Sequence, residues 1–330
     1  MAATGGDHPG RIRMPAATLG PGGPVVSRIG LGLAALGRPA YITAGRADDL
    51  PDRSVAGLRA RTFAMLDAAY AAGIRYADAA RSYGRAEEFL GGWLAERRHP
   101  DLIAGSKWGY RYTGGWRLDA EQQEVKEHSL AMFMAQLAET RALLGDRLAL
   151  YQVHSLTVDS PLFTDPPLLA ALARLRAEGV IIGMSASGPH QADAIRRALD
   201  LTVDGQQLFA EAEVTWNLLE PSAGPAAAEA ASAGWAILVK EAVANGRLTP
   251  AGDPPGPVTA LAAARGVTED AIALAAALAN PWATVVLSGA VTRQQLDANL
   301  AALTVGELPG LDLAESPAGY WAARSARPWR

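Results

Sequence analysis

Short apolar stretches alternate with longer amphipathic stretches along most of this chain. Apolar residues in the longer stretches recur at spacings of three and four, which is typical of helices that pack one face on a core. In residues 61–72, for example, Phe63, Leu66 and Tyr70 share one face, and residues 86–97 repeat the pattern. The short stretches have the composition of buried strands and cover residues 26–30, 74–78, 102–106, 149–153, 180–185, 212–216, 236–240 and 284–288.

The number and order of these segments predict an α/β fold, a single-domain (β/α)8 TIM barrel over residues 25–303. Eight strands, seven helical crossovers and a last helix at 293–303 match that architecture. A doubly wound sheet would also alternate strands and helices, but it would carry a glycine-rich phosphate turn after an early strand. Gly30-Leu-Gly32 lies at the right place and lacks the third glycine of that turn, so a barrel is favoured.

The segments outside the predicted barrel differ in character. Residues 1–24 are rich in Gly, Pro and Ala and have no signal-peptide core, so we expect a flexible tail. Residues 304–330 end in an aromatic and basic stretch, and we expect them to pack on the barrel beside its mouth. The loop 108–116 carries four aromatic side chains, which could form either a pocket wall or a separate small core.

Composition narrows the function classes. The net charge of −4 argues against nucleic acid as the main partner, and the absence of cysteine excludes disulfides and thiolate chemistry. No apolar run approaches the roughly 18 residues that a membrane helix needs, so we expect a cytoplasmic protein without a membrane partner. The thirty basic residues include only three lysines: Lys107, Lys126 and Lys240. Because lysine is a compact point charge that arginine does not replace, each lysine raises the question of a specific role. Lys126 lies in a polar run and fits an ordinary surface residue, which leaves Lys107 and Lys240.

Polar side chains follow three neighbouring predicted strands, where a barrel places its active site. Asp78 and Tyr83 follow the second strand, Lys107 the third and His154 the fourth. Each has an ordinary structural explanation alone: a turn aspartate, a packing tyrosine or a hydrogen-bonded histidine. Together they form a coherent proton donor, because an ammonium near the phenol favours ionisation, an aspartate holds the ammonium, and a neutral histidine can bind a carbonyl oxygen. Such a site needs a hydride source, and a nicotinamide can supply it.

These motifs resemble those of the aldo-keto reductase superfamily from about residue 25 to 303. Residues 78–84 (Asp-Ala-Ala-Arg-Ser-Tyr-Gly) are similar to the family's Asp-Thr-Ala-x-x-Tyr-Gly, residues 105–107 to its strand-three Thr/Ser-Lys, and residues 150–154 to its Leu-Tyr-Gln-Leu-His. The resemblance implies that Tyr83 is the general acid, with Lys107 as its partner. It also implies that Asp78 anchors the lysine and that His154 orients the carbonyl.

The resemblance also implies positions for a dinucleotide. Ser185 would contact the nicotinamide carboxamide, Trp216 stands where a stacking tyrosine is usual, and Glu213 stands where a glutamine is usual. Ala186 replaces an asparagine of the family pattern. Gly32, after the first strand, is a further candidate.

After strand seven, Lys240-Glu241 takes the place of Ser-Pro. These two residues either pair with each other or add charge to the cofactor groove. Arg247 is the candidate for the pyrophosphate, because a cation beside backbone amides suits a phosphate.

Residues 288–299 resemble the family's adenine-end motif, at the N-terminus of the last predicted helix. Gly289 and Thr292 lie in this motif. Gln295 and Asn299 would hold the adenosine, and Arg293 could reach a 2′-phosphate. The resemblance favours NADP(H) as the cofactor and leaves NAD(H) open.

Three functional hypotheses follow. The first is an NAD(P)H-dependent oxidoreductase acting on an aldehyde, ketone or sugar. The second is a regulatory or redox-sensing protein that binds the dinucleotide and turns it over weakly. The third, a metal-dependent barrel, would need clustered histidines and carboxylates at strand ends, where only His154 qualifies and no metal is expected. The small-molecule substrate stays unspecified, and a homo-oligomer stays open.

Overall fold

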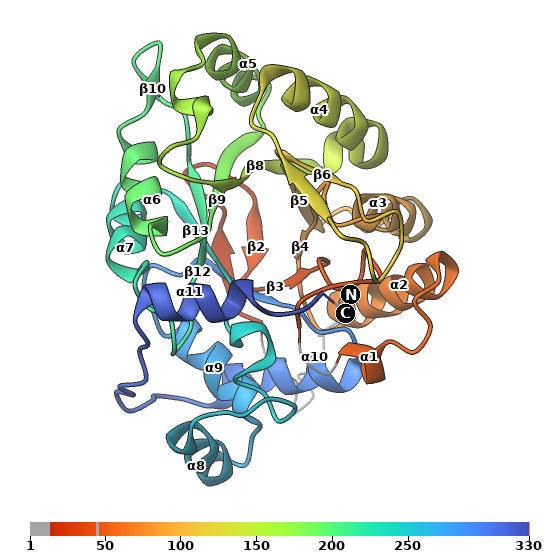
Figure 1. The fold of residues 1–330 in the computed structure, drawn as a ribbon, viewed down its shortest axis with the longest axis vertical. Helices are drawn as coiled ribbons and strands as arrows, with labels where there is room; N and C mark the ends of the chain where they lie inside the picture. The colour runs from red at the N-terminus through yellow and green to blue at the C-terminus, as the bar shows by residue number, and fades with distance from the viewer. Residues whose placement is uncertain (1–13, 44–45, 330) are drawn as a thin grey trace, which may run out of the picture.

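A closed barrel of eight parallel strands forms the centre of the computed structural model, which describes residues 14–43 and 46–329 (Figure 1). The strands follow one another around the barrel in chain order, and the last pairs with the first. They are β3 (Ile29–Gly32), β4 (Tyr76–Asp78), β5 (Ile103–Trp108), β8 (Leu148–Leu156), β9 (Ile181–Ala186), β12 (Glu211–Thr215), β13 (Ala236–Lys240) and β14 (Val285–Ser288). The predicted (β/α)8 barrel is confirmed.

Helices surround this barrel and cover the outer faces of its strands (Figure 1). Their bounds are α1 (Arg46–Asp49), α2 (Val55–Ala71), α3 (Ala86–Arg97), α4 (Leu130–Leu144), α5 (Pro166–Ala177), α6 (Gln191–Leu199), α7 (Gly224–Ser232), α8 (Gly256–Arg265), α9 (Glu269–Leu278), α10 (Arg293–Leu300) and α11 (Pro317–Ser325). The helical pattern at 61–72 lies in α2, which begins earlier because the Ser54 side chain caps it by accepting from the Gly57 N–H. The pattern at 86–97 coincides with α3.

The N-terminal region differs from the expected flexible tail. Residues 1–13 lie outside the described residues, but β1 (Ala16–Thr18) pairs with β2 (Val25–Ser27) in an antiparallel hairpin. The first barrel strand therefore begins at Ile29 rather than Val26. Leu19 and Val26 pack with apolar side chains of the barrel strands, including Tyr76, and close one end of the barrel interior. The two strands have only three residues each, which is too short for a clear alternation of apolar and polar positions.

Several shorter elements decorate the barrel. After β5, an antiparallel hairpin forms from β6 (Tyr110–Tyr112) and β7 (Glu124–Lys126), and a second one forms from β10 (Thr202–Val203) and β11 (Gln206–Gln207). The 3-10 segments are η1 (Gly145–Arg147), η2 (Pro161–Thr164), η3 (Ala244–Gly246) and η4 (Ala301–Thr304). In the view of Figure 1, α11 runs across the near face of the barrel, in front of β12 and β3.

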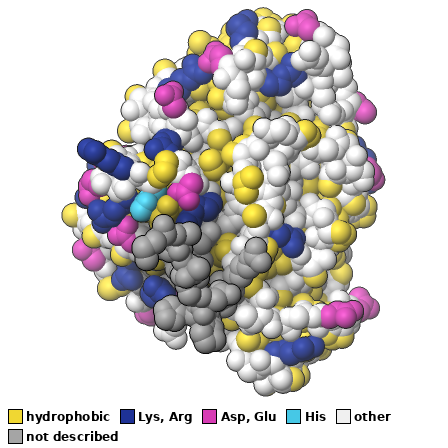
Figure 2. Space-filling view, turned by 180° about the vertical axis from the view of Figure 1, so that it is seen from behind, with side chains coloured by type: hydrophobic (Ala, Val, Ile, Leu, Met, Phe, Trp, Pro, Cys, Tyr) yellow, Lys and Arg dark blue, Asp and Glu magenta, His cyan; other side chains and the backbone are white. Residues whose placement is uncertain are grey.

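On the face opposite to the one seen in Figure 1, positive and negative side chains are not strongly segregated. Figure 2 shows basic and acidic side chains interspersed there with apolar ones. Among the described residues, no helix combines the length and the apolar character needed to cross a lipid bilayer.

Candidate active site

Three neighbouring strands deliver Asp78, Lys107 and His154 to one edge of the barrel. Parallel pairing sets their relative height, with Asp78 opposite Gly105 on β5 and Lys107 opposite Gln152 on β8. All three side chains lie at or near the carboxyl ends of β4, β5 and β8, where barrel enzymes carry their chemistry.

A tight turn after β4 brings Tyr83 back over these strand ends. The Tyr83 N–H donates to the Ala80 carbonyl at 3.0 Å, which closes the turn. Gly84 follows with φ +62°, and a side chain there would clash with the backbone of Gly37. The glycine after the tyrosine is therefore required by both the backbone angle and the close approach of the neighbouring loop.

The structure brings the four predicted catalytic side chains together. The Lys107 ammonium forms an ion pair with Asp78 and donates to the Ala79 carbonyl at 3.3 Å. Its Nζ lies 5.3 Å from the centroid of the Tyr83 ring. The Tyr83 and His154 rings meet edge to face, with centroids 5.5 Å apart. The His154 Nδ1 lies 3.4 Å from the Ser82 hydroxyl.

Burial dominates the electrostatics of this cluster, because all four residues are at most 9% exposed. Burial lowers the pKa of His154 well below its usual value, and the nearby positive charge of Lys107 adds to that effect, so the imidazole is neutral. Burial also lowers the pKa of Lys107, but Asp78 and Glu213 outweigh it and raise the pKa overall. Burial raises the pKa of Tyr83, which keeps its proton, and Lys107 opposes this rise.

The sequence did not indicate the ion pairs of Glu213. The resemblance placed this residue among the cofactor contacts, where a glutamine is usual, and in the structure its Oε2 lies 3.1 Å from the Lys107 ammonium and its Oε1 lies 3.6 Å from Lys240 Nζ. The signals in the sequence were an acid at 213 where the family has an amide, and two of the three lysines, Lys107 and Lys240, near strand ends.

One of the two sequence interpretations was that Lys240 and Glu241 pair with each other. In the structure each of them pairs with a different residue. Lys240 turns toward Glu213, whereas Glu241 forms an ion pair with Arg324 on α11. A positive φ of 56° at Glu241 accompanies this divergence of the two side chains.

The predicted nicotinamide contacts lie along the same edge. The Ser185 hydroxyl is buried on β9 and accepts from the Ser155 N–H at 2.8 Å, so its own hydrogen is available to donate. Trp216, just beyond β12, is half-buried and meets Trp282 edge to face at 6.1 Å. Gly32 ends β3 and is half-buried.

The predicted phosphate and adenosine contacts are engaged with other side chains. Arg247 forms an ion pair with Glu315, and Arg293 pairs with Asp297 at 2.8 Å. Glu315 lies in the segment that precedes α11, and Asp297 lies in α10. The motif pattern indicated neither ion pair.

Among the remaining residues of the adenine-end motif, three already make hydrogen bonds within the protein and one faces open space. Gln295 donates to Asp49 at 2.7 Å, and Asn299 is buried between Ser288 and Asp270. Thr292 caps α10 by accepting from the Gln295 N–H. A side chain built on Gly289 would meet no atom within 4 Å, so open space lies above this end of the barrel.

The C-terminal segment follows the rim of the barrel past three strand ends. Its contacts begin after β12, where the Glu315 N–H donates to Leu219 and Asn217 donates to the Tyr320 hydroxyl at 3.0 Å. They continue after β13, where Arg324 binds Glu241. Beyond α11, the Arg327 side chain donates to the carbonyls of Asn245 and Ile42, and the Trp329 ring lies over Arg38 at 4.6 Å.

The aromatic side chains at the end of β5 and in the hairpin that follows it serve both roles that the sequence left open. Trp108 is fully buried against Phe133 and His128, as in a small core. Tyr110 instead meets His154 edge to face at 5.0 Å and so forms part of the wall of the site.

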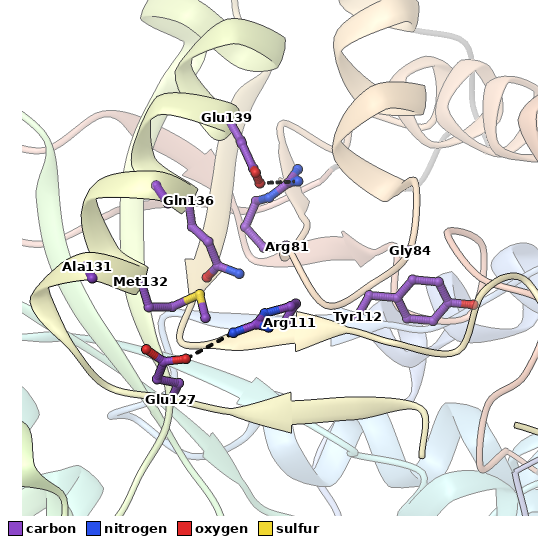
Figure 3. A pocket seen from close by; sticks show the side chains of 10 residues that line it. Arg81, Gly84, Arg111, Tyr112, Glu127, Ala131, Met132, Gln136 and Glu139 are labelled. Atoms are coloured by element: carbon purple, nitrogen blue, oxygen red, sulfur yellow. Dashed lines mark hydrogen bonds and ion pairs between the residues drawn. The ribbon is translucent and has the colours of Figure 1, made fainter. Parts of the chain in front are cut away.

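A cavity of about 530 Å³ lies away from the four catalytic candidates, between α4 and the β6–β7 hairpin (Figure 3). Ion pairs between Arg111 and Glu127 and between Arg81 and Glu139 line it. Among the described residues that line it, none belongs to the catalytic cluster, although Arg81 and Gly84 come from the Tyr83 loop. The described residues also include no group of three or more His, Asp or Glu side chains that could hold a metal ion.

A closed parallel barrel with polar side chains gathered at the carboxyl ends of its strands is the architecture of a barrel enzyme. The model of the aldo/keto reductase family matches residues 28–315, and the chain belongs to that family.

Individual relatives share part of this sequence. The aldo-keto reductase str7 of Strobilurus tenacellus is 30% identical over 192 residues, which are 56% of this chain and 49% of that protein. The match thus spans about half the length of this curated relative.

Solved structures match over more of the chain. A Pseudomonas aeruginosa protein provisionally assigned as an aldo-keto reductase is 26% identical, with a TM-score of 0.62, over 88% of this chain and 94% of its own. The aldo-keto reductase AKR11C1 from Bacillus halodurans, in its holo form, shares the fold with a TM-score of 0.65 and 21% identity, over 94% of this chain and 96% of its own.

Proposed function

We propose that this protein is an NAD(P)H-dependent reductase of small-molecule carbonyl compounds, with Tyr83 as the proton donor. The observation that supports this proposal best is the buried ammonium of Lys107, held by Asp78 and placed 5.3 Å from the Tyr83 ring. The neutral His154 lies against the same ring and can bind a carbonyl oxygen next to the phenol.

The residues around the site fit a dinucleotide at its two ends. At the inner end, Ser185 has a free hydroxyl hydrogen and Trp216 offers a half-buried aromatic face. At the outer end, Gly289 faces open space beside the N-terminus of α10, a favourable place for phosphate. Arg247 would contact the pyrophosphate after exchanging Glu315 for it. We expect NADP(H), with NAD(H) as the other form this arrangement can accept.

The chemistry of this chain's own residues is proton delivery and orientation. A bound reduced nicotinamide supplies a hydride to the carbonyl carbon. As the carbonyl oxygen gains negative charge, the Tyr83 O–H bond breaks and its proton moves to that oxygen, which yields an alcohol. Lys107 stabilises the resulting phenolate, Asp78 keeps the ammonium in place, and water later returns the proton to Tyr83.

The test compares the wild type with Tyr83→Phe, which removes one hydroxyl and keeps the ring. We expect NADPH consumption with a panel of aldehydes, ketones and sugars to fall at least 100-fold in the variant, in line with the usual contribution of a general acid. Dinucleotide binding, followed by fluorescence titration, should stay within about threefold of wild type. A wild type no faster than Tyr83→Phe would refute the reductase activity.

A second candidate function is a regulatory protein that binds a dinucleotide and turns it over weakly. The C-terminal segment favours it, because Glu315 already occupies Arg247 and α11 is tied to the end of β13 through Arg324 and Glu241. Tight binding of NADPH or NADH in the titration, without turnover of any carbonyl, would identify this function instead.

A further inference from the structure

Three departures from the family pattern form one connected group in the structure. Ala186, Glu213 and Lys240 lie on the adjacent strands β9, β12 and β13. The Lys240 ammonium donates to the Ala186 carbonyl at 2.6 Å and lies 3.6 Å from one oxygen of Glu213. The other oxygen of Glu213 lies 3.1 Å from the Lys107 ammonium. A continuous chain of charges therefore runs from Asp78 through Lys107 and Glu213 to Lys240.

The charges along this chain balance. Two carboxylates face two ammonium groups, in a region where Lys107 and Glu213 are at most 1% exposed. An uncompensated charge at such depth is costly, so an acid at 213 requires a nearby cation besides Lys107, which Asp78 already neutralises. Lys240 meets that requirement, which explains why a lysine stands at the end of β13 in a chain that otherwise uses arginine.

A third carboxyl group nearby does not disturb this balance. Glu211 lies on the same strand and accepts hydrogen bonds from the Gln152 amide at 2.9 Å with both oxygens. Burial raises the pKa of Glu211 well above its usual value, although the hydrogen bond from Gln152 opposes the rise, so the group is protonated and neutral.

We propose that Glu213 and Lys240 are a pair of positioning residues that set the proton affinity of Tyr83. Glu213 holds the Lys107 ammonium together with Asp78 and cancels part of its field at the phenol, while Lys240 lies beside the other oxygen of Glu213 and offsets part of the Glu213 charge. Tyr83 thereby retains its proton to higher pH, and the site favours proton delivery in carbonyl reduction over proton removal in alcohol oxidation. This inference rests on the proposed role of Tyr83 as the acid.

Charged and titratable groups face Tyr83 from every element packed against it. Lys107 comes from β5, Asp78 from β4 and Glu213 from β12, and burial raises the pKa of Tyr83 with help from both carboxylates and against Lys107. The others are His154 on β8, which is neutral, and Tyr41 and Arg38 from the segment after β3. Arg38 is itself paired with Glu124 at 2.9 Å, so Glu213 is the charge whose removal changes the balance most directly.

The experiment measures the pH at which Tyr83 ionises in full-length protein carrying Glu213→Gln, Lys240→Met or both changes. The first readout is the pH at which kcat/KM for carbonyl reduction falls on the alkaline side. The second is the tyrosinate absorbance of the protein without cofactor. The contribution of Tyr83 to this absorbance is obtained by subtracting the absorbance of a matched protein that also carries Tyr83→Phe. We expect Glu213→Gln to move both to lower pH by about one unit or more, since one nearby charge shifts a pKa by about that much. Lys240→Met should move them in the opposite direction, and the double variant should lie between Glu213→Gln and wild type.

Glu211→Gln is the matched control, because it makes the same chemical change two residues away on β12. Since Glu211 is already neutral, we expect both readouts to stay at the wild-type pH. If Glu213→Gln does not fold, the double variant, which keeps the charges balanced, gives the same comparison against wild type.

The outcomes separate this inference from the proposed function. The inference alone would be overturned if the wild type is active and both readouts change at the same pH in wild type as in Glu213→Gln or the double variant. A merely structural role for Glu213 would give that result, with lower thermal stability and an unmoved pH dependence. A wild type that reduces no carbonyl would overturn the proposed function, and the directional part of this inference with it.

Discussion

At the scale of single residues, burial determines how polar groups ionise, and hydrogen bonds modify the result. His128 illustrates this in the shell around the site, where its Nε2–H donates to the His154 carbonyl at 2.9 Å and its Nδ1 accepts from the Ser160 hydroxyl at 2.8 Å. Burial lowers the pKa of His128 to about 4, although the bond to His154 opposes this change. The neutral ring thus supports the backbone of His154.

This lowered pKa predicts a pH-dependent contribution to stability. The unfolded chain takes up a proton near pH 6.5 and the native ring only near pH 4, so the native state loses stability as the pH falls through that window. Relative to a His128→Gln variant, we expect wild type to lose roughly 1.4 kcal/mol per pH unit between these values. Urea unfolding at several pH values measures the difference.

An exposed histidine supplies the comparison for this experiment. His190 is largely solvent-accessible beside Asp193, and we expect His190→Gln to change the free energy of unfolding by no more than about 0.5 kcal/mol. Parallel stability curves for wild type and His128→Gln would contradict the assignment of a neutral, buried His128.

At the scale of elements, close approaches between helices depend on single glycines. Gly91 on α3 touches α4, where a side chain would clash with the carbonyl oxygen of Leu143. Its neighbour Gly92 points toward Phe63, whose nearest ring carbon would lie 3.5 Å from an added methyl group, an ordinary contact. The close approach of α4 therefore requires a glycine at position 91, whereas the packing at position 92 leaves room for a methyl group.

Substituting alanine at the two positions should separate them. We expect Gly91→Ala to destabilise the fold by about 1–3 kcal/mol, because overpacking exceeds the gain in helix propensity. Gly92→Ala should be neutral or stabilising by up to about 1 kcal/mol, because only the propensity changes. Chemical denaturation of both variants gives the comparison, and equal effects would show that the α3–α4 contact tolerates a methyl group.

At the scale of the whole molecule, the two ends of the chain complete the barrel. The hairpin of β1 and β2 closes the interior with Leu19 and Val26, and the C-terminal segment lies along the opposite rim, where it contacts the ends of β12 and β13. The catalytic cluster lies beneath that rim. The two terminal segments thus pack against opposite ends of the same barrel.

Removing the tie between α11 and β13 should be costly. Arg324→Ala leaves the Glu241 carboxylate, only 6% exposed, without its guanidinium partner. We expect a loss of about 2–4 kcal/mol, below that for a fully buried pair because a quarter of the Arg324 side chain meets solvent. Arg293→Ala breaks the exposed pair with Asp297 and should change stability by no more than about 0.5 kcal/mol. Thermal unfolding of the two variants tests this, and similar melting temperatures would contradict it.

The sequence alone determined the barrel and the catalytic candidates, because strand period, helix period and residues at strand ends are local properties of the chain. Asp78, Tyr83, Lys107 and His154 could be proposed as candidates because each lies near the carboxyl end of its strand or in the turn that follows, and adjacent parallel strands end side by side. The ion pairs depended on tertiary structure. Arg247 with Glu315, Glu241 with Arg324, and Glu213 between Lys107 and Lys240 join residues 27 to 106 positions apart, and only the closed barrel brings their charges together.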